Sequence, residues 1–367
     1  MKWTKQRINN LFFLLGVATV VVMLLTFDVS FPELWEHICR AGYWLIPIVG
    51  VWFIIYAINA WSWKYIIDSV KSPDEHVSPW RVYRLTITGY ALNYSTPVGG
   101  LGGEPYRIIE LSKNISNDHA ASSVILYAMM HIFAHFWFWF LSIFIYLALV
   151  AVGDLPMTTM VAIVLSLIGV LFVAAFFFFA KGYKRGLAVR GIRWAGKIPG
   201  LKKWSRRTLD HHSGLLHKID RQIADMHKHH KGSFYASLVL EYFSRVVQSS
   251  EFFFMLLLFG IDNGGGWSGL ALTYLHSILI LAFTSFVANI IGFLPMQLGV
   301  QEGGIVLSTA ALGLKPAMGI FESIICRVRE IIWIIIGLVL MKIGGTPPEE
   351  YLKQQQQQDA DDYLDTL

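Results

Sequence analysis

Two segments of this chain interrupt long apolar stretches with prolines, glycines and charged residues. The first runs through residues 93–107 and contains Pro97, with Glu104 seven residues later. The second runs through residues 292–304 and contains Pro295, again with a glutamate seven residues later. Proline removes a backbone donor and glycine permits positive φ, so we expect neither segment to continue as a regular helix.

Such breaks can build a binding site for an anion inside a membrane. Irregular backbone is tolerated in a bilayer only where it is buried in protein or lines a wet cavity, and two corresponding breaks suggest repeated units around a central site. The N-termini of half-helices offer unpaired N–H groups and a positive dipole end, for which phosphate is the obvious ligand. Chance similarity of two glycine-rich loops is the alternative to an inverted repeat. The substrate-binding candidates in the two segments are Pro97, Gly99, Gly100, Gly102, Gly103, Glu104, Arg107, Pro295, Gln297, Gly299, Glu302 and Gly303.

The apolar stretch 234–260 carries a polar stripe, although a charge at the bilayer centre costs about 2.5–3.5 kcal/mol on insertion scales. At about 3.6 residues per turn its polar side chains share roughly a third of the helix circumference, so the stripe should face the protein interior. Glu241 and Arg245 are four residues apart and can pair. The stripe is either a structural ion pair or the lining of a headgroup path, for which the candidates are Arg245, Gln248 and Glu251.

The last apolar stretch, 318–342, holds Glu322, Arg327, Arg329 and Glu330. Arg327 and Glu330 are three residues apart and can form a local pair. Arginine is suited to bidentate contact with phosphate, so Arg327 and Glu330 complete the binding candidates. Interhelical pairing is the alternative role for Arg327.

Metal, cofactor and catalytic motifs are not found in the sequence. His131 and His135 are four residues apart and could share a metal, but without an HExxH motif or an acid in the same stretch, a hydrogen-bonded pair is favoured. No GxxxxGK[ST] motif or nucleophile elbow occurs, and nothing indicates base readout. We therefore predict no metal, no cofactor, no catalytic residue and no nucleic-acid partner.

The elements that must position these residues are membrane-spanning helices. The chain has 367 residues, of which 55% are hydrophobic and 15% charged, whereas soluble domains are about 45–50% apolar and about 25% charged. A span needs about 20 apolar residues, which predicts an all-α polytopic helix bundle with about seven or eight spans and two re-entrant or broken helices. The predicted spans are 9–27, 41–63, 124–152, 157–180, 234–260, 270–294 and 318–342.

Lysine and arginine set the expected orientation. Segment 181–231 holds fourteen of them against three aspartates, so it should be cytoplasmic, and residues 64–84 should lie on the same side. The first span is then uncleaved and starts from a cytoplasmic N-terminus, in a cell (inner or plasma) membrane. If residues 295–315 dip in and return, the C-terminus is external; if 298–314 cross, the tail is cytoplasmic.

The domain organisation follows from this pattern. Residues 1–346 form one transmembrane domain that includes a basic cytoplasmic loop, 181–232. Within that loop, residues 204–232 have the spacing of an amphipathic helix, which packs under the membrane domain or on the anionic leaflet, or else binds a partner. Residues 347–367 form a polar tail of low complexity that we expect to be disordered.

The two broken segments carry a family resemblance. Residues 96–107, with Leu111 following, resemble the first signature of the lysylphosphatidylglycerol synthase transmembrane family, also called flippase-like proteins, and residues 294–303 resemble its second signature. Arg327, ten residues before Gly337, is also similar to the family pattern. The resemblance covers residues 8–342. It implies a polytopic domain with re-entrant helices that moves a lipid or lipid-linked molecule across the bilayer.

Lipid aminoacylation is not carried over, because the chain stops soon after its last span and has no room for the aminoacyltransferase domain of bifunctional members. We therefore expect a lipid translocator, not an enzyme, acting on an anionic phospholipid or a polyprenyl-phosphate-type lipid, and a homo-oligomer is allowed. The alternatives are an intramembrane enzyme acting on a lipid-linked phosphate and a non-transporting membrane scaffold. In the first alternative, Glu104, Glu302 or the histidines would have catalytic roles, and paired carboxylates would serve as acid and base.

Overall fold

All regular structure in the described part of the chain is helical, as predicted. The computed structural model describes residues 31–95, 102–185, 230–290 and 300–343, together with residues 14 and 17 and scattered positions between 189 and 228. The predicted span 9–27, most of helix 204–232 and the tail 347–367 lie outside these residues. In chain order the elements are α2 (Phe31–Ala41), η1 (Gly42–Trp44), α3 (Leu45–Val70), α4 (Pro79–Ser95), α5 (Gly103–Leu111), α6 (Asn117–Ala151), α7 (Thr159–Arg185), α10 (Lys231–Leu258), α11 (Gly266–Ile290), α12 (Val300–Ala311) and α13 (Pro316–Ile343).

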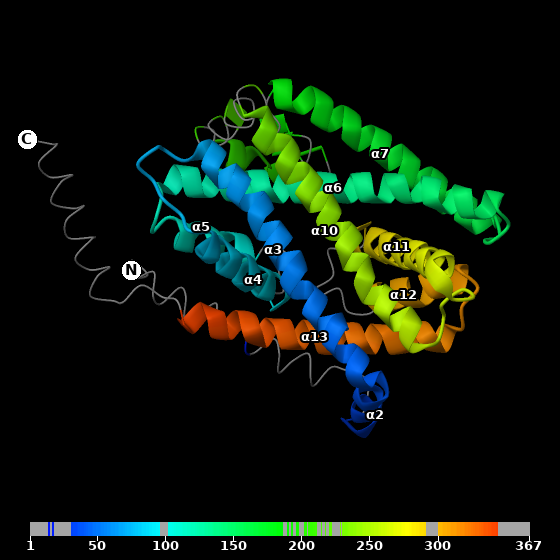
Figure 1. Cartoon of the computed structure of the whole chain (residues 1–367). Helices are drawn as coiled ribbons and strands as arrows, with labels where there is room; N and C mark the ends of the chain where they lie inside the picture. Colours follow the sequence, from blue (N-terminus) through cyan, green and yellow to red (C-terminus); the bar gives the residue numbers. More distant parts are fainter. Residues whose placement is uncertain are drawn as a thin grey trace, which may run out of the picture.

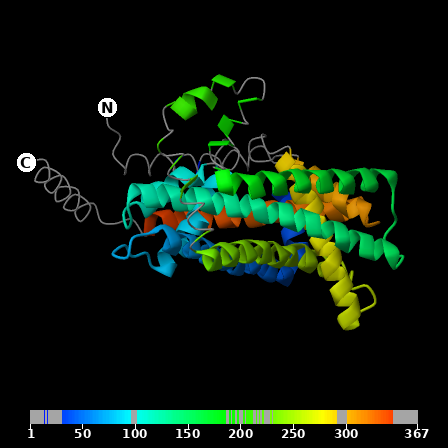
Figure 2. The ribbon, with the colours of Figure 1, turned by 90° about the horizontal axis from the view of Figure 1, so that it is seen from above.

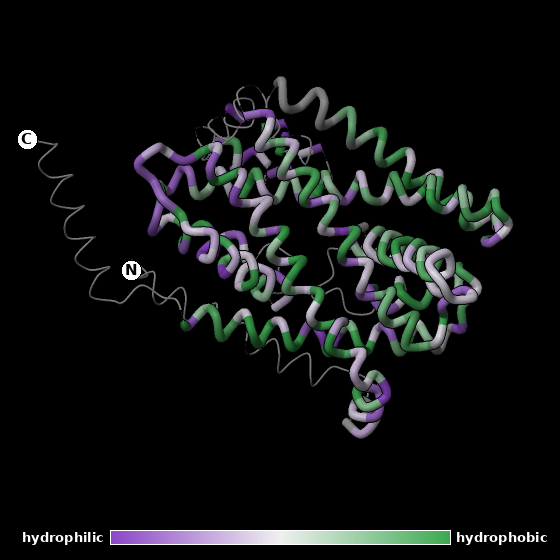
Figure 3. Tube along the Cα trace, viewed as in Figure 1, coloured by the Kyte–Doolittle hydropathy of each residue, from purple (hydrophilic) through white to green (hydrophobic). Residues whose placement is uncertain are grey.

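The helices have the lengths and compositions of a membrane bundle. Three stretches of the described chain are long and apolar enough to cross a bilayer: Trp35–Val70, Asn117–Ala151 and Gly266–Asn289. Helices α10 and α13 have 28 residues each, about 42 Å at ~1.5 Å per residue, but carry the charged residues predicted for them. Hydropathy along the trace shows mostly hydrophobic residues in α7 and hydrophilic residues at the connection between α3 and α4 (Figure 3). The protein is an all-α membrane helix bundle.

Helices α3 and α10 lie side by side through the middle of the bundle (Figure 1). Small residues allow the contact: the hydroxyls of Ser62 and Ser237 lie 2.9 Å apart, and both side chains are fully buried. The long helices α6, α7 and α13 run roughly parallel to one another when the molecule is seen from above (Figure 2). Helices α3, α6 and α11 pack against α10.

Each broken segment joins two antiparallel helices. In the first unit, Arg81 of α4 donates to the carbonyl of Glu110 in α5 at 2.8 Å, and at the other end Asn93 accepts from the backbone N–H of Gly103 at 2.6 Å. In the second unit, the Thr284 hydroxyl of α11 lies 3.2 Å from that of Ser308 in α12. Helices α5 and α12 have 9 and 12 residues, about 14 and 18 Å. Neither alone can cross a hydrocarbon core of about 30 Å, and each lies against the helix before it, so we call the pairs α4–α5 and α11–α12 the re-entrant units.

Helix α13 packs against both re-entrant units. A Cβ atom at Gly337 would overlap the methyl group of Ala91 in α4, and one at Gly319 would overlap Val306 and Thr309 of α12, so glycine permits both close approaches. Near its C-terminal end, Met341 packs against the cluster that contains Val77, in the connection between α3 and α4. The end of α13 therefore lies at the same end of the bundle as residues 71–78. This favours the alternative with the tail on the side of residues 64–84, although α12 alone is too short to be the crossing helix of that alternative.

Candidate functional site: two buried ion networks

The first network begins where α5 lies against α4. Gly89 has no side chain, and the guanidinium of Arg107 occupies the space that a Cβ there would fill. Arg107 donates from Nε to the carbonyl of Leu85 at 3.4 Å and from its NH2 group to the carbonyl of Thr86 at 3.2 Å. Its NH1 group lies 3.5 Å from Glu104, three residues earlier, which confirms that these two residues share one helical face. Arg107 thus fastens the two arms of the first unit.

Aromatic rings enclose the same guanidinium. The Cζ atom of Arg107 lies 4.9 Å from the ring centre of Tyr90, 5.5 Å from that of Tyr127 and 5.6 Å from that of Trp63. Cation–π contacts gain strength where water is excluded, and Arg107 is only 2% exposed. Direct contact of Arg107 with a lipid headgroup stays a prediction from the sequence. The geometry shows Arg107 holding the start of α5 against α4.

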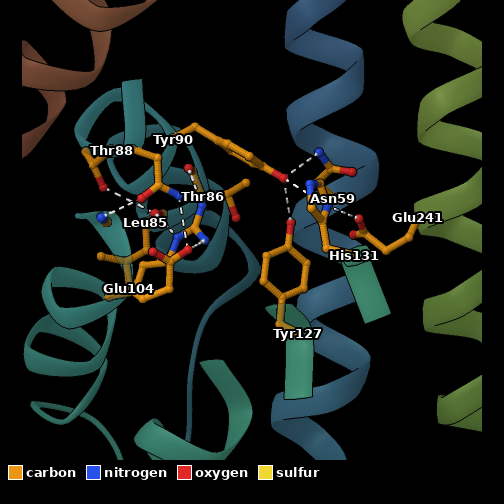
Figure 4. A network of polar contacts seen from close by, with 12 residues as sticks. Asn59, Leu85, Thr86, Thr88, Tyr90, Glu104, Tyr127, His131 and Glu241 are labelled. Carbon is orange, nitrogen blue, oxygen red and sulfur yellow. Dashed lines mark hydrogen bonds and ion pairs between the residues drawn. The ribbon is translucent and has the colours of Figure 1, made fainter. Parts of the chain in front are cut away.

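A hydroxyl connects Arg107's aromatic cage to α10 (Figure 4). The Tyr90 hydroxyl accepts from Nδ2 of Asn59 at 3.4 Å and lies 3.2 Å from the Tyr127 hydroxyl and 3.4 Å from Nδ1 of His131. Tyr90 and Tyr127 come from α4 and α6, and Asn59 comes from α3. The network therefore reaches across three helices before it meets the polar stripe of α10.

His131 joins the network to that stripe. Its Nδ1 lies 2.7 Å from Oε2 of Glu241, and its Nε2 lies 2.5 Å from the NH2 group of Arg245. A tautomer with the proton on Nδ1 satisfies both contacts, since Nδ1 then donates and Nε2 accepts. Sequence spacing predicted a direct pair between Glu241 and Arg245, whereas the structure brings each to the same imidazole. Arg245 also donates to Gln248 at 2.7 Å.

The two histidines of α6 form a hydrogen-bonded pair through the backbone. Nδ1 of His135 lies 2.9 Å from the carbonyl oxygen of His131, and their ring centres are 4.8 Å apart. Among the described residues, no group of three or more His, Cys, Asp or Glu side chains is arranged to hold a metal ion.

The second network begins where α12 lies against α13. Arg327 donates from Nε to Oε1 of Glu302 at 2.7 Å and from its NH1 group to Glu330 at 2.7 Å. The contact with Glu330 confirms the local pair predicted from their spacing. Gln301 also donates to Glu330, at 3.0 Å. Arg327 is 3% exposed, whereas the Glu302 side chain is 28% exposed. Glu302 is therefore the accessible side of this network.

The second network continues to α10 and α3. Arg329 donates from Nε to Oε1 of Glu251 at 2.8 Å, and the Trp52 indole donates to Oε2 of the same carboxylate at 3.0 Å. The Arg329 guanidinium also lies over the Trp52 ring, 4.1 Å from its centre. Arg329 was not among the binding candidates, whereas its partner Glu251, 78 residues away in sequence, was. The excess of charges in 318–342 was the only sequence signal for it.

A row of aromatic rings on α3 and α4 connects the two networks. The Tyr56 ring lies 5.4 Å from that of Tyr90 and 5.5 Å from that of Trp52. The Tyr90 ring contacts Arg107, and the Trp52 ring contacts Arg329. The stripe of α10 provides a second connection, because Glu241 belongs to one network and Glu251 to the other. The residues that flank the two broken segments therefore meet in one interior.

The predicted site residues divide by their placement. Glu104, Arg107, Arg245, Gln248, Glu251, Glu302, Arg327 and Glu330 all belong to the two networks. Gly102 lies just before α5, Gly103 accommodates the backbone of α4, and Gly303 has open space around it. Pro97, Gly99, Gly100, Pro295, Gln297 and Gly299 lie outside the described residues. No sequence pattern indicated the roles of Tyr90, Tyr127 and Trp52, which are aromatic residues in helices rich in them.

Glu104 and Arg245 each keep a buried polar atom without a hydrogen-bond partner. These atoms are Oε2 of Glu104 and Nε of Arg245. Glu104 is 20% exposed at its side chain, and Arg245 and Gln248 are half-buried. A buried donor without a partner costs about 1–3 kcal/mol, so Arg245 has unused capacity to bind an acceptor. Phosphate oxygens are acceptors of the right kind.

Comparison with known proteins places the chain in a family. The sequence pattern described as "Lysylphosphatidylglycerol synthase TM region" matches residues 13–337. A "UPF0104 membrane protein" of Methanothermobacter thermautotrophicus is 22% identical over 348 residues, which cover 92% of this chain and 96% of that protein. No solved structure matches the chain. With a match across almost all of its helices, the chain belongs to the lysylphosphatidylglycerol synthase transmembrane-region family.

Proposed function

We propose that this protein translocates an anionic lipid, or the headgroup of a lipid-linked molecule, across the cell membrane. The observation that carries the proposal is the paired construction of the two re-entrant units. Each short arm starts with a glutamate that binds a nearly fully buried arginine, Glu104 with Arg107 and Glu302 with Arg327. Helix α10 contacts both networks, so one polar interior serves both units.

Arg327 is the proposed primary contact for phosphate. Its two carboxylate partners differ in exposure, because Glu302 is 28% exposed and Glu330 only 2%. A phosphate approaching from the open side would replace Glu302 and leave the bond to Glu330 intact. Arg245, with its unpartnered Nε, is the second contact. Arg107 holds α5 against α4, and its positive charge attracts the phosphate without contacting it.

Acyl chains would remain among lipids or apolar helices while the headgroup crosses. The outer face of α7 exposes Met160, Ile163, Leu167 and Val170, which suits contact with lipid tails. An apolar pocket lies between the α6–α7 pair and the α11–α12 unit, lined by residues that include Tyr146, Leu165, Leu279 and Leu312. Rocking of one unit against the other would expose the polar interior to each side in turn.

The proposal includes an orientation. The N-terminus and the basic segment 181–231 are cytoplasmic, since lysine and arginine concentrate on that side. The end of α13 lies beside residues 71–78, which share that side. The substrate is an anionic phospholipid or a polyprenyl-phosphate-type lipid, and the protein has no enzymatic step of its own.

Transport is tested with purified protein in vesicles that contain labelled phosphatidylglycerol, with the lipid's movement followed by a membrane-impermeant quencher. Arg327→Lys keeps the charge but loses the fork of donors, so we expect flipping to slow by at least about tenfold, since a charge-assisted hydrogen bond is worth roughly 1.5–3 kcal/mol. Arg206→Lys, at an exposed position of the basic segment, is the matched control and should flip normally. Flipping by Arg327→Lys at the control rate would contradict the role of Arg327.

The enzymatic alternative rests on the two partly exposed carboxylates, Glu104 and Glu302. The same vesicles distinguish it: analysis of the lipids after incubation would show a new product with wild-type protein and none with Glu104→Gln. Chemically unchanged lipid that has crossed the bilayer supports transport. Deletion of residues 204–232 with transport retained would exclude a scaffold role as the main function.

A further inference from the structure

Glu322 of α13 is an acid that neither network uses. Its side chain is fully buried, and neither carboxyl oxygen has a hydrogen-bond partner among the described residues. The fully buried glutamates of the two networks, Glu241, Glu251 and Glu330, each contact a histidine or an arginine. Glu322 therefore differs from its neighbours in both its isolation and its lack of a countercharge.

The surroundings of Glu322 are apolar. Phe321 and Ile325, on either side of it along α13, belong to the same hydrophobic cluster as Ala41 of α2 and Phe252 and Met255 of α10. One turn before Glu322, Gly319 lies directly against Val306 and Thr309 of α12. An ionised carboxylate without a partner in such a place is strongly disfavoured, so the side chain must carry a proton in this conformation.

Most charged groups on the surrounding elements are paired elsewhere, whereas Nδ1 of His37 has no hydrogen-bond partner among the described residues. Glu251 binds Arg329, Glu302 binds Arg327, His276 lies 2.7 Å from Asp154, and the Arg40 guanidinium lies over Phe259 and Phe321. The His37 ring lies 5.3 Å from that of Phe321. Titratable and charged groups on the elements packed around this part of α13 include His37 and Arg40 of α2, Tyr94 of α4, Glu251 of α10, His276 of α11, Glu302 of α12, and Cys326, Arg327, Arg329 and Glu330 of α13 itself.

We propose that Glu322 is a proton-binding site that couples transport to a proton gradient. The inference rests on the proposed function and adds its energy source. The described conformation accepts Glu322 only with its proton, whereas a conformation that opens this part of α13 to water accepts the carboxylate. A proton that binds one conformation better than the other shifts the population between them. Exchange of the proton with opposite sides of the membrane then makes the conformational cycle follow the gradient.

The position of Glu322 allows this coupling. It lies five residues before Arg327 on the same helix, so a movement of α13 that hydrates Glu322 also moves the proposed phosphate contact. The close packing of Gly319 on α12 carries the movement to the re-entrant arm that supplies Glu302. Proton release and lipid release would therefore occur in the same transition.

The test uses the full-length protein in vesicles that contain labelled phosphatidylglycerol and an imposed pH gradient. With one proton per lipid, a gradient of one pH unit should displace the transbilayer distribution of the lipid about tenfold. Glu322→Gln mimics the protonated form and should leave the distribution near its value without a gradient, while downhill movement persists. Glu36→Gln, the same change at an exposed position of α2, should behave as wild type.

Each outcome decides a different point. Wild-type protein that moves lipid but ignores the pH gradient overturns the inference and leaves the proposed function intact, as does a Glu322→Gln variant that still follows the gradient. A response to a sodium gradient in place of the proton gradient also overturns it. Absence of lipid movement by wild-type protein contradicts the proposed function instead.

Infrared spectroscopy tests the site without reference to transport. A protonated carboxyl group has a C=O stretch distinct from that of a carboxylate. We expect such a band in wild-type protein at neutral pH, lost in Glu322→Gln and retained in Glu36→Gln. If Glu322→Gln does not fold, the pH dependence of the band in wild-type protein still decides the question. No protonated carboxyl band at neutral pH would overturn the proton site.

Discussion

Glu251 of α10 and Arg329 of α13 are joined by two hydrogen bonds, of 2.8 and 3.3 Å, although 78 residues separate them in sequence. Both side chains are buried, at 1% and 3% exposure, and the Trp52 indole binds one partner while its ring covers the other. The pair therefore fixes the central helix α10 to the helix that contacts both re-entrant units. Loss of this pair should therefore lower the stability of the whole bundle.

Loss of one partner of this pair should destabilise the protein strongly. Glu251→Leu leaves the Arg329 charge buried with only part of its compensation, and unfolding should become easier by about 3–5 kcal/mol. The double variant Glu251→Leu/Arg329→Met should recover much of that loss, because no charge is then left unpaired. Thermal unfolding in detergent measures both. A double variant no more stable than Glu251→Leu would contradict this account. The control is Asp68→Ala, which removes a half-exposed pair with Lys64 and should change the stability little.

Gly103 should be intolerant of any side chain. A Cβ there would overlap the carbonyl of Gly89 and the Asn93 side chain, so the two arms of the first unit would have to separate. Overpacking of this kind costs about 1–3 kcal/mol, and the thermal unfolding temperature of Gly103→Ala should fall. Gly50→Ala, with nothing within 4 Å of the new methyl group, should be neutral or stabilising because alanine favours the helix. Equal stability of the two variants would contradict the close packing.

Tyr90→Phe should weaken the first network without opening a large cavity. The variant keeps the ring over Arg107 and the contact with Tyr56 but removes the hydroxyl shared by Asn59, Tyr127 and His131. Buried groups that lose a partner cost about 1–3 kcal/mol, which should appear as a lower unfolding temperature. Tyr43→Phe changes the same group at a side chain that is 72% exposed and should have no effect.

Glu75 should make stability depend on pH at the end of the bundle that holds residues 71–78. Burial alone would raise the pKa of Glu75, but hydrogen bonds from the backbone of Ser116 and Ser72 and from His119 outweigh it and lower the pKa. The stabilisation that the Glu75 carboxylate contributes is therefore complete above the ordinary pKa of 4.5. It is lost as the pH falls through the lower pKa that Glu75 has in the folded protein.

Unfolding curves at several pH values test this expectation. Wild-type protein should be more stable than Glu75→Gln at neutral pH, and the difference should shrink as the pH falls below about 4.5. A difference that stays constant down to acid pH, or grows, would show that the carboxylate is not the source of the effect.

Local spacing in the sequence predicted the parts of the site that lie on one helix. The polar stripe of α10 faces the interior because its residues repeat at the helical period, and Arg327 pairs with Glu330 because three residues bring them to one face. The same reasoning was wrong about the partner of Glu241, since His131 approaches from α6. Contacts between distant segments, such as Trp52 with Glu251, depend on packing that no local pattern encodes.

The hydropathy pattern located the long helices, including the charged helices α10 and α13, and missed α4. Stretches predicted at 124–152 and 270–294 correspond to α6 and α11. Helix α4 was not predicted as a span because residues such as Arg81, Arg84 and Asn93 lower its hydropathy. These residues are acceptable there because α5 and α13 cover α4, and such cover is a property of the assembled bundle.

The charges of α10 and α13 also bear on how the protein is made. Each helix carries at least one arginine and one glutamate that would cost about 2.5–3.5 kcal/mol to leave uncompensated in lipid. Arg329 emerges from the ribosome only after α11 and α12, so α10 must wait beside the insertion machinery or a chaperone until its partner arrives. Biogenesis of this membrane protein is therefore expected to be a delayed, cooperative release of several helices rather than the independent partitioning of each one.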